Sequence, residues 1–531
     1  MSGSKSSVSF PAVATLGRCI ILAVALAGCA KREAPQASPA VAPQILRLSQ
    51  RNEPADLDPA KTTLADEFGI LRTLFEGLLI PGADGGTPRP GAATRFAVSP
   101  DGLTYTFHLR PDGRWSDGTA VTAAHFIDAY RRILSPANAG PKANVFYGVK
   151  NARAFATGKL NDFAAVGFSA PDARTLVITL AGPNPRFPYA VASGPWLPVR
   201  TDVVVKHGRN WTRPENFVGN GPFLLAEWRP DQRIVVRKNP AWHNASGVKL
   251  AEIHFVRFDS GDSEERAYRA GQVEATMAVP FSKVPGYTRE RTAELHKRAM
   301  IETRYLSFNT QRPPLNDARV RRALALAIDR TQLAERVLQG GQPATGRFVP
   351  PALRAAVEPD LSTVEHQHDP AAARALLAAA HLTPKNFPRL ELSFWSSPAV
   401  LEAIQAMWRQ ELGLEVALAQ REARVHLAAL STGAYDIAFM TAIPDLADPA
   451  DLLGDFTTGA PENYPHWGDA AFDAALIRGD IAAAERRLLE AVPLTPLYFN
   501  TKIWLMSPRV HGWAEDGLWS RSYEQVFLDE K

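Results

Sequence analysis

Cysteine is almost absent from this chain of 531 residues, which contains only Cys19 and Cys29, both near its start. A disulfide framework or a cysteine-ligated zinc site needs several thiols at suitable spacings. The main body of the chain has none, so we expect no disulfide, no thiol redox pair and no cysteine-ligated zinc site. We also expect no cofactor. Its stability has to come from burial of apolar side chains, which the 46% hydrophobic content allows.

Long apolar runs are also missing. Residues 20–26 form a short apolar run, well below the ~20 residues that a membrane-spanning helix needs. Lys5 and Arg18 precede it, and this order is typical of a secretory signal peptide. The segment that follows resembles a bacterial lipobox, in which the cysteine carries lipid such as palmitate. It reads Leu26-Ala27-Gly28-Cys29. We predict a signal peptide over residues 1–28 and lipid attachment at Cys29.

Residues 29–44 are rich in Ala and Pro and show no apolar periodicity. This composition predicts a flexible tether. The remaining chain is longer than one hydrophobic core normally spans, which favours two or three domains.

Clusters of one charge are missing. The 59 Lys and Arg and the 55 Asp and Glu side chains interleave along the whole chain, and the net charge is +4. No basic cluster with interleaved aromatic residues stands out, so we expect no nucleic-acid partner.

The sequence motifs of common hydrolases are missing too. There is no Gly-x-Ser-x-Gly, no His-Glu-x-x-His and no Ser-x-x-Lys with a Lys-Thr-Gly element. The nearest metal-like cluster, residues 365–369, contains two histidines and two carboxylates, but it reads as a loop in which Asp369 caps the next helix. We expect no metal site and no enzymatic activity. An exported hydrolase remains the weakest of the alternatives.

The pattern of apolar residues predicts an α/β chain. Alternation of period two predicts strands over residues 103–110, 234–237, 253–256 and 390–394. Helical periodicity predicts helices over residues 123–134, 320–339, 370–380, 401–411 and 482–491. Asn316 and Asp317 are expected to cap a helix that begins near Ala318, and the arginines in its first turns, Arg319, Arg321 and Arg322, to pair with carboxylates.

Several blocks resemble the oligopeptide- and dipeptide-binding proteins of bacterial ABC importers, extracellular solute-binding protein family 5. The most specific block is Ser-Pro-Asp-Gly-Leu-Thr-Tyr-Thr-Phe at residues 99–107, continued by Trp-Ser-Asp-Gly-Thr at 115–119. Another block is Pro-Pro-Leu-Asn-Asp-Ala-Arg-Val-Arg at 313–321. Residues 52–59 resemble the family's opening strand and turn, residues 74–79 its next helix, and residues 219–223 and 237–242 further landmarks. The resemblance covers nearly the whole mature chain.

The resemblance implies a large, type II-like periplasmic-binding-protein clamp with two lobes and an additional domain inserted in the first. Lobe I is expected over residues 45–75, 205–303 and 501–531, the additional domain over 76–204 and lobe II over 304–500. Two strands crossing between the lobes would act as a hinge, and closure would enclose the ligand.

The resemblance also implies a ligand site. Asp445, in the loop after a predicted strand, would pair with the α-ammonium group of a peptide. The other residues that the resemblance places at the cleft are Thr63, Leu64, Ala65, Lys142, Tyr305, Phe439, Thr441, Ala442, Ile443 and Phe499. Asp445 as a turn residue beside Pro444 is the structural alternative, and Asp436 and Asp451 are expected to be structural.

The chain departs from the family at several site positions. The family commonly has an aromatic residue where Ala442 stands, and some members have an arginine, which meets a peptide C-terminus, where Phe439 stands. Thr63 replaces an acidic residue, and Lys142 replaces a pocket aromatic. Either Lys142 or another cation supplies the missing positive charge, or the ligand is not a short free peptide.

The resemblance therefore implies a monomeric, lipid-anchored periplasmic protein that captures peptides and delivers them to an ABC permease complex. The alternative is the same clamp serving as a sensor or scavenger for a non-peptide solute. The anchor is expected in the inner or the outer membrane of a Gram-negative bacterium. Ala30 follows Cys29, where an Asp would resemble a signal for retention in the inner membrane, and under that rule the tether ends in the outer membrane.

Overall fold

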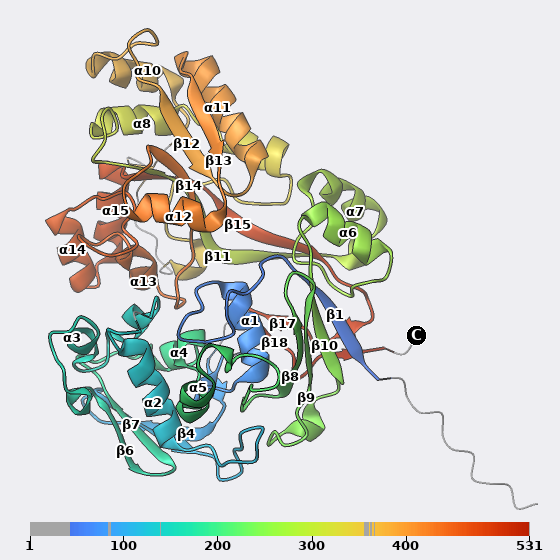
Figure 1. Ribbon diagram of the computed structural model, residues 1–531. Coiled ribbons are helices and arrows are strands. Elements are labelled where there is room, and N and C mark those ends of the chain that lie inside the picture. Colours follow the sequence, from blue (N-terminus) through green and yellow to red (C-terminus); the bar gives the residue numbers. More distant parts are fainter. Residues whose placement is uncertain are drawn as a thin grey trace, which may run out of the picture. The chain divides into compact units, whose positions relative to one another are not determined.

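The computed structural model describes residues 43–529 except 83–86, 139, 355–360, 362, 363 and 366. The predicted signal peptide, Cys29 and nearly all of the predicted tether lie outside these residues. Those that are described form the predicted two-lobed α/β architecture (Figure 1). Among them, no helix is both long and apolar enough to cross a membrane.

The sheet of lobe I has the strand order β1-β10-β9-β8. Its strands are β1 (Ile45–Gln50), β8 (Phe223–Arg229), β9 (Arg233–Lys238) and β10 (Glu252–Arg257). β1 runs parallel to β10, and the other neighbours are antiparallel. Leu46, Leu48, Ile253 and Phe255 are buried, as period-two alternation requires for a sheet with one face on the core.

A second sheet, in the additional segment of lobe I, has the order β4-β5-β7-β6. Its strands are β4 (Ala93–Val98), β5 (Thr104–Leu109), β6 (Phe168–Asp172) and β7 (Thr175–Thr179). The β4–β5 hairpin turns at Gly102, whose φ of 72° suits glycine. Buried apolar residues from both sheets belong to one continuous core, so this segment packs directly on lobe I.

The sheet of lobe II has the order β13-β12-β14-β11-β15. Its strands are β11 (Leu295–Phe308), β12 (Leu390–Phe394), β13 (Val416–Gln420), β14 (Ile437–Ala442) and β15 (Leu494–Leu505). Helices of this lobe are α8 (Ala318–Leu326), α10 (Pro370–Ala379), α11 (Pro398–Leu412), α12 (Ala423–Ser431), α13 (Pro449–Gly454), α14 (Ala470–Ile477) and α15 (Ile481–Ala491). Sheet and helices enclose two buried apolar clusters.

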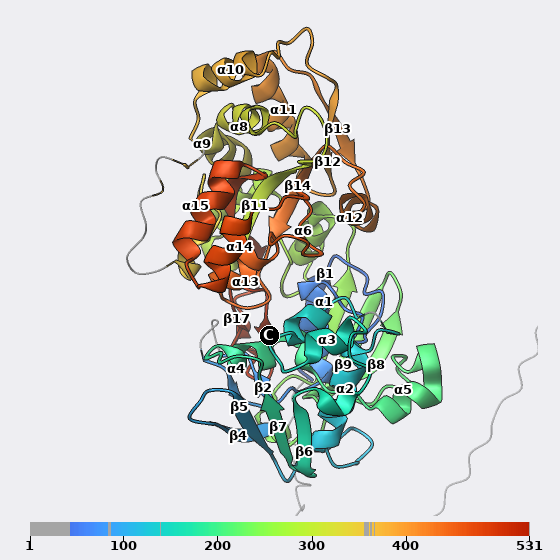
Figure 2. The ribbon, with the colours of Figure 1, turned by 90° about the vertical axis from the view of Figure 1, so that its left-hand side faces the viewer.

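β11 and β15 connect the lobes as a long antiparallel pair (Figures 1 and 2). At one end, Leu306 and Leu497 lie in the core of lobe II. At the other, Ile503 and Leu505 pack with α6 (Gly261–Arg269) and α7 (Val284–Glu290). Two of the predicted domain boundaries, 303/304 and 500/501, fall inside these strands. The domain bounds themselves stay predictions.

Other helices belong to the first part of the chain. They are α1 (Ala65–Leu74), α2 (Ala123–Leu134), α3 (Ala152–Ala156), α4 (Phe187–Val191) and α5 (Thr201–His207). Short two-stranded ribbons are formed by β2 (Leu79–Ile80) with β3 (Arg89–Pro90), β16 (Val510–His511) with β19 (Phe527–Leu528), and β17 (Ala514–Glu515) with β18 (Arg521–Ser522).

All four predicted strands are confirmed, and so are four of the five predicted helices, with ends shifted by a few residues. The prediction of one helix over 320–339 is wrong. α8 ends at Leu326. A second helical segment, α9 (Arg330–Gln332), begins after Asp329, whose side chain accepts from the backbone N–H of Gln332. A π-helical turn over Leu333–Leu338 continues α9. A helix over 74–79 is also wrong, because α1 ends at Leu74.

Helix caps were predicted well. Asp369 accepts from the N–H of Ala372 at 2.9 Å, and Asp317 accepts from that of Arg319 at 2.8 Å. Arg319 also pairs with the carboxylate of Asp317. The expected carboxylate partners of Arg321 and Arg322 were wrong: both donate to backbone carbonyls near the C-terminus of α15 instead. Those carbonyls are left free by the end of that helix, so a cation satisfies them.

Candidate functional site

A cavity of about 570 Å³ lies between the lobes. Its lining includes residues of α1 and α4 of lobe I and of the loop before α13 of lobe II, and Figure 1 labels these helices. The lining residues are Thr63, Leu64, Phe68, Arg72, Pro81, Gly82, Pro88, Lys142, Arg186, Tyr189, Ala192, Ser193, Gly194, Pro195, Ile301, Ala352, Ile443, Pro444, Asp445, Leu446, Ala447, Asp516, Gly517, Leu518 and Ser520. Its volume suits a small organic ligand.

Helix α1 forms one wall on the side of lobe I. Phe68 and Arg72 are four residues apart, so they lie on the same face of the helix, and both line the cavity. The helix is fixed at its start by Glu67, whose carboxylate accepts from the N–H of Leu64 at 3.3 Å. Gly194 packs so closely on the ring of Phe68 that a Cβ atom there would collide with it.

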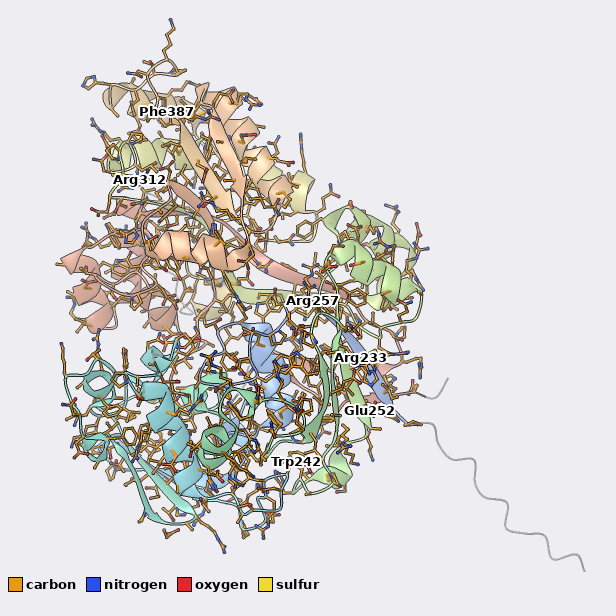
Figure 3. The ribbon with its side chains drawn as sticks, in the orientation of Figure 1. Arg233, Trp242, Glu252, Arg257, Arg312 and Phe387 are labelled. Carbon is orange, nitrogen blue, oxygen red and sulfur yellow. The ribbon has the colours of Figure 1, made fainter. Side chains whose placement is uncertain are left out.

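The opposite wall is the loop that follows β14, residues 443–447. The carboxylate of Asp451 accepts from the N–H of Leu446 at 2.9 Å, and that of Asp448 caps α13 by accepting from the N–H of Ala450. Asp436, at the other end of β14, pairs with Arg312, which Figure 3 labels, at 3.0 Å. Asp436 is not among the residues that line the cavity. The contacts of Asp451 and Asp448 hold the loop that carries Asp445.

Lys142 and Asp445 form an ion pair across the cavity. Lys142 Nζ donates to the two carboxylate oxygens of Asp445 at 3.0 and 3.2 Å. Burial by itself lowers the pKa of Lys142, but the charges of Asp445 and Glu462 outweigh burial and hold that pKa above its ordinary value. Lys142 therefore stays charged and bridges the lobes.

Arg186 makes a second contact between the lobes. Its guanidinium donates to the carbonyl oxygen of Ala447 at 2.6 Å and lies 3.7 Å from a carboxylate oxygen of Asp448. About half of the side chain is exposed, so this contact is weaker than a buried pair.

Arg72 lines the cavity without a partner. Over the described ranges between 43 and 529, its side chain makes no hydrogen bond and no ion pair with another residue. Burial lowers the pKa of its guanidinium, and the charge of Asp516 partly offsets this. Asp516 is itself held by the N–H groups of Leu518 and Ser520, each at 2.8 Å.

The structure brings together five of the residues that the sequence placed at the cleft: Thr63, Leu64, Lys142, Ile443 and Asp445. Ala65 begins α1 beside them. The other five are not among the residues that line the cavity. Phe439, Ala442, Tyr305 and Phe499 are buried, and Thr441 donates to Glu302 at 2.8 Å.

Tyr305 and Phe499 were expected to border the cleft, and the structure places them elsewhere. Tyr305 contacts Phe348 and Phe456 edge-to-face inside lobe II, and Phe499 lies beneath the guanidinium of Arg354. Aromatic packing inside the lobe accounts for both. The sequence reading missed Arg72, Arg186 and Asp516. A signal for the first existed: a single cation in an otherwise largely apolar helix.

A carboxylate that holds the loop carrying Asp445 should make the stability of the protein depend on pH. Burial, with the nearby charge of Asp445, raises the pKa of Asp451 to about 7. The folded state then keeps a proton that the unfolded state releases above about pH 4, so this group lowers stability as the pH rises from about 4 to about 7. Asp451→Asn keeps an acceptor for Leu446 and removes the titration. We expect the variant to be more stable than the parent by about 1–3 kcal/mol at pH 8 and equally stable at pH 4, as measured by urea unfolding. An equal difference at both pH values would contradict this assignment.

Three comparisons place the chain among known proteins. The model of bacterial extracellular solute-binding proteins, family 5 (Middle), matches residues 87–464. The "Probable deoxycholate-binding periplasmic protein YgiS" of Escherichia coli is 31% identical over 502 residues, covering 90% of this chain and 92% of that protein. The periplasmic murein peptide-binding protein MppA of Escherichia coli is 31% identical over 542 residues, covering 98% and 99%. The periplasmic oligopeptide-binding protein OppA of Escherichia coli is 30% identical over 491 residues, covering 89% and 90%.

Solved structures agree with this. The structure of the murein tripeptide-binding protein MppA of Escherichia coli has a TM-score of 0.86 at 28% identity and covers 92% of this chain and 99% of that one. The unliganded open form of MppA, with 28% identity and coverage of 93% and 99%, has a TM-score of 0.68. Since both structures are of one protein, the lower score shows that the lobes here are arranged less like those of the open form.

Proposed function

This chain belongs to the bacterial extracellular solute-binding proteins of family 5, and we propose that it captures peptides or peptide-like solutes between its lobes and delivers them to an ABC importer. The observation that carries the proposal is the cavity of about 570 Å³, whose lining comes from both lobes. A ligand there would be enclosed by closure and released by opening about β11 and β15. The names of MppA and OppA, which refer to murein peptides and oligopeptides, support this class of ligand.

The proposal includes the predicted location and anchor. The protein would be periplasmic and monomeric, tethered through lipid on Cys29 to the inner or outer membrane, and would carry out no chemistry on its ligand. Several acyl chains make such an anchor durable. The domain bounds predicted from the sequence and the role of Asp445 at the ligand site belong to the same proposal.

A non-peptide solute is the second candidate, with the clamp working as a sensor or scavenger. The observation that favours it is the contact between Lys142 and Asp445, because it leaves the proposed peptide anchor already paired. The relative named as a probable deoxycholate-binding protein supports a wider range of ligands for this fold.

Native mass spectrometry of the purified protein tests both candidates. After incubation with a tryptic peptide mixture, we expect retained peptides of defined length. Asp445→Ala should lower their retention at least tenfold, because it removes the ion pair that closes the cleft over them. Asp112→Ala is the control, because it changes an exposed carboxylate that does not line the cavity. Absence of any retained peptide, with Asp445→Ala unchanged in thermal stability, would reject peptide capture. New amino termini appearing in the mixture would indicate a hydrolase.

A further inference from the structure

Arg72 is a charged group placed where a ligand would meet it. It projects from α1 beside Phe68 into the cavity, and among the described residues no side chain or carbonyl accepts from it. The opposite charge that acts on it is that of Asp516, which forms no ion pair with it and already accepts two backbone N–H groups. A guanidinium left partly out of water without acceptors is unfavourable, so an acceptor supplied by the ligand would be stabilising.

The shape of the guanidinium group determines which acceptor fits it. Its N–H groups form a rigid planar fork that matches the two oxygens of a carboxylate. Lysine at this place would offer only a point charge. A neutral carbonyl would satisfy one donor and leave the charge unbalanced.

Asp445, by contrast, is already paired. Both of its oxygens accept from Lys142, which comes from the other lobe. The charge of Glu462, also in lobe II, adds to the attraction for this lysine. An α-ammonium group of a ligand would therefore have to displace a cation that is tethered to the chain and already in place, and which pays no entropy of association.

The rest of the lining is largely apolar. Leucine, phenylalanine, isoleucine and proline side chains from both lobes contribute to it: Leu64, Phe68, Pro81, Pro88, Pro195, Ile301, Ile443, Pro444, Leu446 and Leu518. Such walls suit the apolar body of a ligand, with a few polar groups fixing its orientation.

We propose that Arg72 binds a carboxylate of the ligand, while Lys142 fills the place at Asp445 that a ligand ammonium group would otherwise take. The cavity then selects amphipathic carboxylic acids whose amino group is blocked or absent, such as N-acylated peptides. This inference rests on the proposed function, since it concerns the ligand of the same cavity. Some family members have an arginine where this chain has Phe439. We infer that Arg72 supplies the positive charge that is missing there.

The test is a matched set of ligands measured by isothermal titration calorimetry. One apolar tripeptide is prepared with free ends, with an acetylated N-terminus, and with an acetylated N-terminus and an amidated C-terminus, and deoxycholate is included as an amphipathic carboxylate without peptide bonds. We expect the acetylated acid to bind at least as tightly as the free peptide. Amidation should weaken binding at least tenfold. Binding of deoxycholate but not of the acetylated acid would identify a non-peptide carboxylate as the ligand class.

Three variants locate the effect. Arg72→Met should weaken binding of the acids at least tenfold and leave the amide unchanged, whereas Arg72→Lys should recover part of the loss. Lys142→Met frees Asp445 and should raise the affinity for the free peptide relative to that for its acetylated form. Arg95→Met, an exposed arginine on β4, is the control and should change nothing. Thermal unfolding checks that each variant is folded.

The outcomes separate this inference from the function on which it rests. If the free peptide binds tightly and is insensitive to Arg72→Met, the inference is overturned and peptide capture stands. If no member of the set binds the parent protein, peptide capture and the inference both fail.

Discussion

Glu515→Gln is expected to destabilise the protein by about 3–5 kcal/mol, because it leaves two buried cations without their counter-ion. The carboxylate of Glu515 contacts Lys502, on β15, and accepts from Arg521 at 2.8 Å. Both partners are nearly inaccessible to solvent. The cluster joins the β17–β18 ribbon to one of the two strands that connect the lobes. Urea unfolding at pH 7 measures the loss.

Lys502→Met is the matched variant, and we expect it to be neutral or to stabilise the protein by about 1–3 kcal/mol at pH 7. It removes one of the two cations and leaves Arg521 paired with Glu515. The methionine can occupy the space between Trp504 and Trp519, over whose rings the ammonium group now lies at 4.6 and 5.3 Å.

The pH dependence gives an independent measurement of the same cluster. Burial, helped by the charge of Arg521, lowers the pKa of Lys502 to about 7. Between about pH 7 and 10.5 the unfolded state therefore binds more protons than the folded state, so this group makes the stability rise with pH across that window. Below about pH 7 Lys502 is charged in both states, and the destabilisation that comes from burying its charge is then present in full. The rise should be absent from Lys502→Met. If Glu515→Gln and Lys502→Met proved equally destabilising, the cluster would not be governed by its excess of positive charge.

Gly194→Ala is expected to lower ligand affinity at least a hundredfold. A Cβ atom at this position would lie 2.1 Å from a ring carbon of Phe68, far inside van der Waals contact. The ring is buried against lobe I and borders the cavity, so the space open to it is the ligand site. Overpacking should also lower the free energy of unfolding by about 1–3 kcal/mol. Calorimetric titration with the ligand retained in native mass spectrometry measures the affinity.

Gly69→Ala is the control for this variant. It lies next to Phe68 on the same helix, and a Cβ atom there meets nothing within 4 Å. Alanine favours helix more than glycine does, so we expect unchanged affinity and a gain of up to about 1 kcal/mol in stability. Phe68→Ala combined with Gly194→Ala should recover binding, since it removes the colliding ring. Full affinity in Gly194→Ala alone would show that the segment around Gly194 yields instead of the ring.

Much of the fold could be predicted from the sequence because its signals are local. The β4–β5 hairpin follows from Asp101-Gly102 between alternating apolar residues, and Asp317 and Asp369 mark the starts of α8 and α10 by accepting from N–H groups two or three residues ahead. The long helix predicted over 320–339 failed for a related reason. Periodicity continues through Ala327 and Asp329, but Asp329 caps a new segment and so breaks the helix.

The site divides in the same way. The sequence by itself, through its resemblance to a family, determined the two lobes and singled out Asp445 and Lys142 as separate positions at the cleft. Only the tertiary structure decided that these two residues, 303 positions apart, pair with each other, and that Arg72 faces the same cavity without a partner. Strand alternation and helix caps depend on neighbours along the chain, whereas the partner of a charged side chain depends on which lobe folds against it.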